Sequence, residues 1–553
     1  MELIFKLLPS TEKCFWDEKI ENKPELTTFS MLKNEKLDFQ LAYASKDLGW
    51  HSKFLSLEIE SDIKSAVSVS RIENVPVNLP IWMDATENDG FLRTEPGLYP
   101  DLLIPMEDQN KLIFSYRELR SLMITVENTD GIPAGEHYVT LKAMDGETCM
   151  CSATAKITVV DAFLPELELV HTEWFHCDCL ASYYDVPVFS ERHWEIIETY
   201  MREAAYHGVN LILTPVFTPP IDTAIGGERL TVQLTDVTVT DNGYEFGFSR
   251  FDRWVELAKN CGMKYFEISH LFTQWGCKYA PKVIANVNGE EKRIFGWETD
   301  ALSDEYRTFI RAFLTAFVAH AKELGIIDKC YFHISDEPHL DHLESYKKAK
   351  EMIYDIVGEY PMMDALSSYE FYETGAVKIP VPSTNHISPF IENNVTPLYT
   401  YYCCGQYHKV SNRFLSMPGA RTRILGTQLF KYDVVGFLQW GFNFYNCQFS
   451  NYPINPYVDT CGEHFVPAGD AYLVYPGPKG KPYRSLHGMQ FLSALTDLRA
   501  FKLLSSLIGK EKTMAIIEEG IDPITFDEYP MDQEYLIRLR EKINSAIAEA
   551  LKA

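Results

Sequence analysis

Hydrophobic and polar positions along the chain fall into two patterns that meet near residue 160. Before that point, short runs such as KLDFQLAYA, FLSLEIE and HYVTLKA are rich in β-branched and aromatic residues, and helical spacing is scarce. Runs of this length, separated by turn residues, are typical of the strands of two packed sheets. We therefore predict an N-terminal β-sandwich domain over residues 1–162.

From about residue 166, strand-like apolar runs alternate with amphipathic helices. The segment HWEIIETYMREAAYHG places apolar side chains at helical spacing and ends in Gly208, a residue that favours a helix stop. A second long helix is expected over about 304–324. The alternation leaves eight candidate strands, at about 167–175, 209–216, 264–271, 329–336, 361–367, 381–387, 397–404 and 435–445.

Eight strands alternating with helices over roughly 280 residues is typical of a (β/α)₈ barrel. A doubly wound open sheet is the alternative, but no Gly-rich dinucleotide-binding motif follows any strand. The predicted fold class is α/β, a TIM-like (β/α)₈ barrel over residues 163–483 behind the β-sandwich. A polar hairpin with a turn at Asn242 and Gly243 interrupts the barrel, and residues 484–553 form a helical extension packed on it.

Charge excludes two classes of partner. The chain carries 51 basic and 78 acidic residues, a formal net charge of −27, which repels nucleic acid and anionic membrane surfaces. No run reaches the ~18 apolar residues that a membrane span needs. The first residues show no basic segment followed by a long apolar run, so we expect a cytoplasmic enzyme.

The twelve cysteines are scattered along the chain, and none forms a C-x-x-C pair. In a large chain of this kind, free thiols packed as small apolar groups are more common than disulfides or zinc ligands. We therefore predict no structural metal, and no motif indicates a cofactor.

Two adjacent carboxylates, Asp336 and Glu337, follow the fourth candidate strand in the run KCYFHISDEPHL. Outward positions of a barrel strand pack under helices and are apolar, which assigns Ile334 outward and His333 and Glu337 to the lumen. Asp336 faces outward in an ideal strand, but Pro338 ends the strand, and a bend there brings both acids to the mouth. Active sites of barrel enzymes lie at this end of the strands.

A purely structural interpretation of the pair is also open: Asp336 would begin a turn, and Glu337 would meet a basic partner. The residues at the other strand ends favour a site, because aromatic rings stack on sugars while amide, imidazole and carboxylate groups bind hydroxyls. We expect Trp174 and Gln274 near this site. The candidate sugar contacts are His176, Asp178, His270, Trp275, His333, Tyr401, Tyr402, Trp440 and Asn443.

The adjacency of the two acids restricts the mechanism. A retaining glycosidase with its own nucleophile separates its carboxyls by ~5–5.5 Å across the anomeric carbon, and an inverting one by ~6.5–9.5 Å. Neighbouring residues do not easily straddle a sugar ring in that way. They suit a substrate-assisted route, in which the 2-acetamido oxygen of the sugar attacks, one carboxylate orients the acetamido group and the other is general acid and then base. Burial and the charged neighbour predict a raised pKa for the acid.

Four further segments belong to one recognisable set: WFHCDCLASYYDVPVFSERHW, ISHLFTQWG, FHISDEP and DAYLVYPGPKGKPYRSL. Together they resemble glycoside hydrolase family 123, the β-N-acetylgalactosaminidases, and the resemblance covers most of residues 70–510 in order. It implies a (β/α)₈ catalytic domain behind a β-sandwich, acting on terminal β-linked N-acetylgalactosamine (GalNAc) of glycans or glycolipid oligosaccharides by the substrate-assisted retaining mechanism. In that mechanism Asp336 would hold the acetamido group, and Glu337 would protonate the leaving oxygen.

Two alternatives stay open at this stage. One is a glycosidase of the same architecture acting on a different sugar, such as one without the acetamido group. The other is a non-catalytic carbohydrate-binding protein, in which the acid pair stabilises a loop. Hydrolysis of a β-GalNAc aryl glycoside, but not of its galactose counterpart, would separate the first hypothesis from the other glycosidase, and the activity of Glu337→Gln would separate it from the binding protein. The sequence also leaves open the choice between N-acetylgalactosamine and N-acetylglucosamine.

Overall fold

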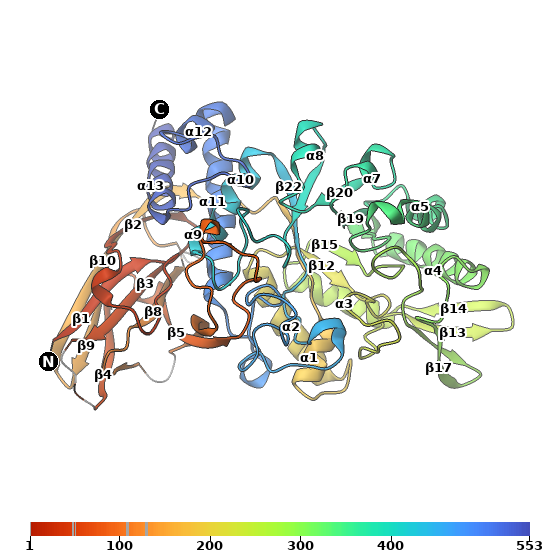
Figure 1. Cartoon of the computed structure of the whole chain (residues 1–553), viewed down its shortest axis with the longest axis horizontal. Coiled ribbons are helices and arrows are strands. Elements are labelled where there is room, and N and C mark those ends of the chain that lie inside the picture. The colour runs from red at the N-terminus through yellow and green to blue at the C-terminus, as the bar shows by residue number, and fades with distance from the viewer. Residues whose placement is uncertain (1, 47–48, 50, 107–109, 128–130, 553) are drawn as a thin grey trace.

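The N-terminal part of the chain consists of two five-stranded sheets (Figure 1). The protein is described from a computed structural model that covers residues 2–46, 49, 51–106, 110–127 and 131–552. One sheet has the order β1 (Leu3–Pro9), β3 (Lys36–Ser45), β8 (Arg120–Glu127), β5 (Val67–Val77) and β6 (Gly97–Pro105). The other has the order β2 (Thr28–Lys33), β10 (Thr148–Phe163), β9 (Gly135–Asp145), β4 (Lys53–Ser61) and β7 (Lys111–Phe114).

Alternating side chains explain how these sheets form a core. In β4, Leu55 and Leu57 are buried, whereas Phe54 and Ser56 are exposed, because successive side chains of a strand point to opposite faces. Buried residues of both sheets join one apolar cluster, in which Leu41 of β3 belongs together with residues of β4 and β9. The two sheets therefore share one core.

The central part contains eight short parallel strands, and each overlaps one of the eight predicted segments: six lie within them, and two begin one or two residues earlier. They are β11 (Val170–Glu173), β12 (Leu211–Thr214), β15 (Tyr265–Ile268), β18 (Cys330–Tyr331), β19 (Met363–Leu366), β20 (Ile379–Pro382), β21 (Leu398–Tyr401) and β22 (Val434–Gln439). Their ladders run β11–β22–β21, β12–β15–β18 and β19–β20. Single parallel bridges, Phe332 to Met362 and Ser383 to Tyr401, continue the strongly curled sheet between these ladders.

Helices separate the strands, and local sequence explains where the longest ones begin. α2 (Glu191–Tyr206) starts after Ser190, whose side chain accepts a hydrogen bond from the backbone N–H of His193. α4 (Asp304–Glu323) is capped in the same way by Ser303. The remaining helices of this part are α1 (Cys177–Tyr183), α3 (Ser249–Asn260), α5 (Leu343–Glu351), α6 (Tyr354–Val357), α7 (Glu370–Glu373), α8 (Ser388–Glu392), α9 (Gly419–Arg423) and α10 (Leu425–Lys431).

A four-stranded sheet is inserted around α3 and projects at the right edge of Figure 1. The predicted hairpin is confirmed as β13 (Asp236–Thr240) and β14 (Gly243–Gly247). Its turn is shifted by one residue from the prediction: Asp241 and Asn242 form the loop, and Gly243, at φ 121°, already pairs with Thr240. A second hairpin, β16 (Val283–Val287) and β17 (Glu290–Phe295), pairs with β13 and was not predicted.

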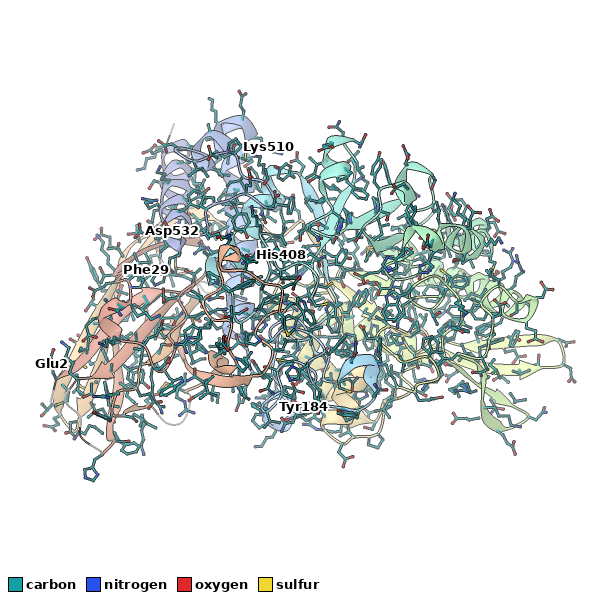
Figure 2. All side chains as sticks on the ribbon, in the orientation of Figure 1. Glu2, Phe29, Tyr184, His408, Lys510 and Asp532 are labelled. Carbon is teal, nitrogen blue, oxygen red and sulfur yellow. The ribbon has the colours of Figure 1, made fainter. Side chains whose placement is uncertain are left out.

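Three helices, α11 (Leu486–Ile508), α12 (Lys510–Ile517) and α13 (Gln533–Ala550), form the C-terminal part. α11 packs on α9 and α10, whereas α13 also lies against β2 and β10 of the N-terminal sheets. Arg540 of α13 forms ion pairs with Glu35 at 2.6 Å and with Asp497 of α11 at 3.0 Å. In Figure 2, Phe29 of β2 and Asp532 just before α13 accordingly lie at the same end of the molecule. The extension thus joins both parts of the chain.

No helix within the described ranges is long and apolar enough to cross a membrane. The twelve cysteines are free thiols, and eight of them are buried.

Candidate active site

Asp336 and Glu337 lie on a turn beyond the end of β18. The prediction of a strand over 329–336 was too long, because the ladder ends at Tyr331. The backbone N–H of Ile334 donates to the Asp364 carboxylate at 3.1 Å instead of continuing a ladder, so the chain leaves the sheet there. Glu337 then adopts φ 41°, a left-handed conformation that is rare for a residue with a side chain. Both acids are half-buried.

Tyr401, the last residue of β21, contacts the second acid directly. Its hydroxyl donates to Glu337 Oε1 at 2.5 Å, and Cys403 Sγ lies 4.0 Å from the same oxygen. Within the described part of the chain, neither Asp336 nor Glu337 has an ion pair with a Lys, Arg or His side chain. A basic partner, which the structural interpretation of the pair requires, is therefore missing from the described residues.

A third carboxylate, Asp222, belongs to the same electrostatic cluster. Burial raises the pKa of Asp336 well above its ordinary value, and the charges of Glu337 and Asp222 raise it further. Burial also raises the pKa of Asp222 to about 7. The Asp222 backbone N–H donates to Gln274 Oε1 at 2.6 Å, which places this loop residue after β12 beside the expected site. Asp222 was not predicted from the sequence, because nothing in the pattern of its loop distinguishes it.

His333 lies beneath the acid pair and supports it. Its Nε2 is 2.8 Å from Glu267 Oε1 and its Nδ1 is 3.0 Å from Asp364 Oδ1, so both ring nitrogens donate to carboxylates. Burial alone would lower the pKa of His333, but these two hydrogen bonds and charges raise it to about 10. His333 was expected to contact sugar, and the structure instead places it, 1% exposed, in a buried charge network.

Glu267 connects this network to β11. It accepts hydrogen bonds from Trp174 Nε1 at 2.7 Å and from the hydroxyl of Thr172. The His270 ring stacks on His333 with centroids 4.2 Å apart, and burial lowers the pKa of His270 well below its ordinary value. His270 is therefore a neutral ring against a charged one, and it is 2% exposed. Of the predicted contacts, His270 and His333 both lie below the mouth.

A metal could be imagined at His270, His333 and Asp364, whose ligand atoms all lie within 4.8 Å of one another. Both nitrogens of His333, however, donate to carboxylates, and an imidazolium has no lone pair for a metal ion. His333 therefore cannot be a ligand in this protonation state. The donor set fits a proton-linked charge network and not a metal centre.

A second buried cluster ties the ends of β11 and β22 together. Arg229 donates to both Asp178 oxygens at 2.8 Å and lies 3.1 Å from His176 Nδ1. His176 Nε2 lies 2.9 Å from the Trp440 carbonyl oxygen, and its backbone N–H donates to Asn443 Oδ1 at 2.9 Å. Burial, followed by the Arg229 charge, lowers the pKa of His176 to about 4. The predicted polar contacts in this cluster form hydrogen bonds with other groups of the protein. They therefore hold the loops at the strand ends in position.

The remaining predicted aromatics lie at different distances from the acids. Tyr402 is fully buried with its ring against Phe437, because it points to the other face of the strand from Tyr401. Trp440 donates its indole N–H to Asp470 Oδ2 at 2.8 Å and is 8% exposed. Trp275 is 42% exposed, and its backbone N–H donates to the Asp336 carbonyl oxygen at 3.1 Å. Of these residues, Tyr401 contacts Glu337 through its side chain, and Trp275 contacts Asp336 through its backbone.

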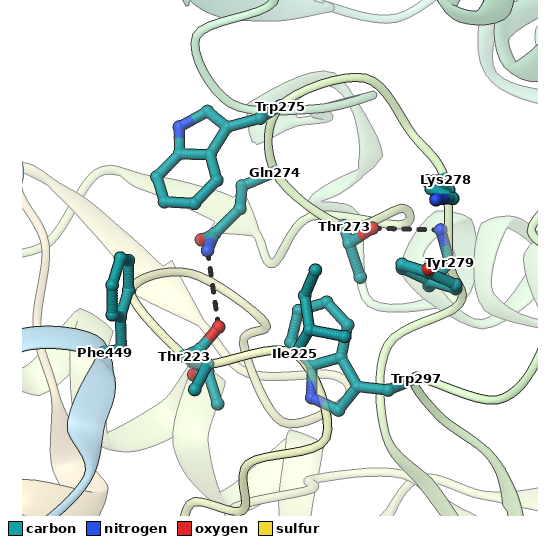
Figure 3. A pocket seen from close by; sticks show the side chains of 10 residues that line it. Thr223, Ile225, Thr273, Gln274, Trp275, Lys278, Tyr279, Trp297 and Phe449 are labelled. Carbon is teal, nitrogen blue, oxygen red and sulfur yellow. Dashed lines mark hydrogen bonds between the residues drawn. The ribbon is translucent and has the colours of Figure 1, made fainter.

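A cavity of about 320 Å³ opens beside Trp275 (Figure 3). It is lined mainly by aromatic and aliphatic side chains from the loops after β12, β15 and β22. Its lining residues are Thr223, Ala224, Ile225, Thr273, Gln274, Trp275, Lys278, Tyr279, Trp297 and Phe449. The cavity is connected to the acid pair through its Trp275 wall, whose backbone N–H donates to the Asp336 carbonyl oxygen. A half-buried acid pair and an apolar cavity on joined loops are expected of an enzyme site for a ligand with apolar faces.

Comparisons with known proteins bear on the family and the fold of the chain. No curated protein matches the chain. A structure of a family 123 glycoside hydrolase from Clostridium perfringens, described for glycolipid glycan hydrolysis, is 15% identical, with a TM-score of 0.72 over 100% of this chain and 98% of that one. An FMN-binding β-glucuronidase from Facaelibacterium prausnitzii has a TM-score of only 0.34, at 9% identity over 84% of this chain and 59% of that one.

The family comparison is the more specific finding. The catalytic domain of glycoside hydrolase 123 matches residues 174–504, which include all the candidate site residues named above. The match spans more than half of the chain and agrees with the resemblance found in the sequence. The protein therefore belongs to glycoside hydrolase family 123, and it is a glycoside hydrolase with a carbohydrate substrate.

Proposed function

We propose that the protein removes terminal β-linked GalNAc from glycans or glycolipid oligosaccharides, as an exo-acting enzyme with a substrate-assisted retaining mechanism. The observation that carries the proposal is the placement of Asp336 and Glu337 on one turn, both half-buried and without a basic partner among the described residues. Neighbouring carboxyls on one turn do not flank an anomeric carbon, so the sugar's own acetamido oxygen supplies the nucleophile.

In the first step, the acetamido oxygen forms a bond to C1 while the glycosidic C–O bond breaks. Glu337 transfers its proton to the leaving oxygen, and Asp336 accepts a hydrogen bond from the acetamido N–H as the oxazolinium charge develops. In the second step, Glu337 takes a proton from water, the water oxygen bonds to C1, and the ring of the intermediate opens. Two displacements at C1 return the β-configuration.

The contact of Tyr401 with Glu337 supports this division of labour. Because the Tyr401 hydroxyl donates to Oε1 at 2.5 Å, the proton of the acid is carried by the other carboxyl oxygen. The Tyr401 hydroxyl is neutral, so it fixes the orientation of the carboxyl group without placing a positive charge beside it. Tyr401 is therefore proposed as the residue that positions the general acid.

The raised pKa of Asp336 supports the role proposed for this residue. A half-buried carboxylate beside two other acids gains most from a positive partner, and the oxazolinium N–H supplies one during the reaction. The interaction is then stronger in the transition state than in the free enzyme. The similar Clostridium structure is described for glycolipid glycan hydrolysis, which supports glycolipid oligosaccharides as one substrate class.

We further propose that the eight strands close into a (β/α)₈ barrel over residues 163–483. The parallel pairing of β22 with β11 and the hydrogen bond from Asn210 N–H to the His171 carbonyl oxygen, at 3.0 Å between β11 and β12, support closure. Residues 1–162 would form the β-sandwich domain, and residues 484–553 the helical extension.

Three ligands test the proposed activity. A β-GalNAc aryl glycoside should be hydrolysed, the corresponding galactoside should not, and GalNAc-thiazoline, a stable mimic of the oxazoline, should inhibit tightly. Comparable hydrolysis of the galactoside, together with no inhibition by the thiazoline, would contradict acetamido participation. A gluco-configured aryl glycoside in the same assay measures the preference between the two hexosamines.

A further inference from the structure

We propose that Cys403 and Cys404 form a modification site for two-electron thiol oxidants, which join the two sulfurs in a disulfide and thereby inhibit the enzyme. The inhibition rests on the proposed function, because it takes Glu337 as the general acid. Hydrogen peroxide is a suitable oxidant. Its O–O bond and the two S–H bonds break, one S–S bond forms, and both peroxide oxygens leave as water with the thiol hydrogens.

The two cysteines directly follow β21 and lie beside the acid turn. Cys403 Sγ is 4.0 Å from Glu337 Oε1, the same oxygen to which Tyr401 of β21 donates its hydrogen bond. The thiols of Cys403 and Cys404 are close enough to hydrogen-bond to each other. The chain therefore brings two sulfurs together, and one of them contacts the proposed general acid.

The pair is also accessible to a small oxidant. Eight of the twelve cysteines are buried, and such thiols are protected from reagents in solution. Cys403 and Cys404 are both partly exposed, and Gly405, which follows them, is exposed. The other cysteines that are not buried are Cys149 and Cys151 of β10, in the N-terminal sheets. They provide a comparison outside the site.

The environment of Cys403 sets the order of the two oxidation steps. The hydrogen bond with Cys404, followed by burial and by the charges of Cys404 and Glu337, raises the pKa of Cys403 well above its ordinary value. A thiol that keeps its proton reacts slowly with peroxide. Peroxide therefore converts Cys404 to a sulfenic acid with release of one water, and the Cys403 sulfur then displaces a second water from it.

A disulfide between neighbouring residues is easily reduced again. Adjacent Cα atoms lie about 3.8 Å apart across a trans peptide, whereas the Cα atoms of an ordinary disulfide are ~4.4–6.8 Å apart. The bond between Cys403 and Cys404 is therefore strained. Strained disulfides are the labile and regulatory ones, so a dithiol reductant should reverse this modification.

Closure of the disulfide alters the groups that orient the general acid. The peptide group between the two cysteines has to rotate, although Asn412 Nδ2 donates to the Cys403 carbonyl oxygen at 2.9 Å and Trp82 Nε1 donates to that of Cys404 at 2.8 Å. The rotation displaces the end of β21, which carries Tyr401. The oxidised Cys403 sulfur also has no hydrogen to donate to Glu337. Both changes disturb the neutral donors around this acid.

Peptide mass measures the disulfide without reference to activity. Tryptic cleavage after Lys378 and Lys409 releases the peptide 379–409, in which Cys403 and Cys404 are the only cysteines. After peroxide treatment this peptide should be lighter by two hydrogens, and dithiothreitol should restore its mass. Cys404→Ser and Cys404→Ala remove one sulfur of the pair, and Cys149→Ser, at an exposed cysteine of β10, is the matched control.

The expected loss of activity is selective. Oxidation of wild type should lower kcat/KM by about tenfold or more for an aryl β-GalNAc glycoside with a poor leaving group, and less for the 2,4-dinitrophenyl glycoside, which needs little protonation. Dithiothreitol should restore the activity. Both Cys404 variants should keep the untreated activity within about twofold and resist peroxide, whereas Cys149→Ser should be inhibited like wild type.

Three results would overturn the proposal: an unchanged mass of peptide 379–409, equal inhibition of wild type and the Cys404 variants, or equal inhibition with both leaving groups. A failure of the proposed function is a different outcome. In that case untreated wild type would hydrolyse neither glycoside, while the peptide mass would still show whether the two sulfurs join.

Discussion

The acid pair at the mouth and the charge network beneath it are built from the same kinds of residue but differ in how their oxygens are used. In the network, His333 donates to both Glu267 and Asp364, and Glu267 also accepts from Trp174. At the mouth, Glu337 accepts from two neutral donors, the Tyr401 hydroxyl at 2.5 Å and the Cys403 thiol at 4.0 Å, and has no basic partner among the described residues.

This difference separates residues that hold the site from residues that act on a substrate. A buried charge that is fully hydrogen-bonded stabilises one geometry and leaves no group for a ligand. A half-buried acid whose oxygens lack partners destabilises the enzyme in the absence of substrate. A substrate that supplies the missing partner removes this destabilisation. The variants below test whether the two regions respond as this comparison requires.

The largest expected effect is on the acid itself. Glu337→Gln should lower kcat/KM by about 10³ to 10⁴ for a substrate with a poor leaving group, because general acid catalysis contributes up to about that factor. With a 2,4-dinitrophenyl leaving group, which needs little protonation, the loss should be much smaller. Steady-state kinetics on both substrates measure the ratio, and equal losses would remove Glu337 from the role of acid.

A substitution in the buried charge network should lower the stability of the fold, and not only the activity. His333→Leu leaves Glu267 and Asp364 buried without their shared cation, which should lower the free energy of unfolding by about 3–5 kcal/mol. Urea unfolding measures this loss, and His51→Leu, at an exposed histidine, serves as control.

The pH dependence follows from the sign of the shift at His333. Its pKa in the folded protein is raised from 6.5 to about 10, so its contribution to stability is complete below pH 6.5 and is lost as the pH rises through 10. The difference in the free energy of unfolding between wild type and His333→Leu should therefore become smaller as the pH rises from 6.5 to 10. A difference that stayed constant with pH would show that His333 is not charged.

Asp336→Asn should reduce activity and stabilise the fold. Losing the electrostatic partner of the oxazolinium should lower kcat by about 10² to 10³, equally for good and poor leaving groups. Because the pKa of Asp336 is raised in the folded state, its ionised form destabilises the fold above pH 3.8. The variant should therefore have a higher Tm at pH 7 and an unchanged Tm below pH 3.8. A lower Tm at pH 7 would contradict the assignment.

The smallest effect is expected from Asp222. Since its charge raises the pKa of Asp336, Asp222→Asn should move the acidic limb of the kcat/KM profile to lower pH, by less than about one unit. Asp241→Asn, in the exposed turn of the first hairpin, is the control and should leave the profile in place. A shift to higher pH would contradict the proposed electrostatic contact.

The positions of the strands could be predicted from the sequence, but their lengths could not. Buried parallel strands are continuous apolar runs, so 361–367 and 397–404 were found as β19 and β21. The run at 329–336 looks equally strand-like, yet Asp364 of the next strand captures the backbone of Ile334. That contact joins residues 30 positions apart, and no local pattern reveals it. The second hairpin was missed although Asn288 and Gly289 mark its turn.

The site could be predicted where its residues are neighbours in sequence and not where they meet only in space. The two adjacent acids could be located from the sequence alone. The alternation of side chains along a strand would also have placed Tyr401 and Tyr402 on opposite faces. His176 and Asn443 have the chemistry of sugar contacts, but they bond to each other across 267 residues. Asp222 lies in a loop without periodicity. Polar groups bound to one another are indistinguishable in a sequence from polar groups free for a ligand.

The left-handed backbone of Glu337 has a consequence for directed evolution of this enzyme. A side chain at φ 41° costs about 1–2 kcal/mol relative to a glycine, which adopts such angles freely. A library screened for heat resistance alone would therefore enrich glycine at position 337 and discard the proton donor. Screens for robust variants should retain a catalytic readout in every round.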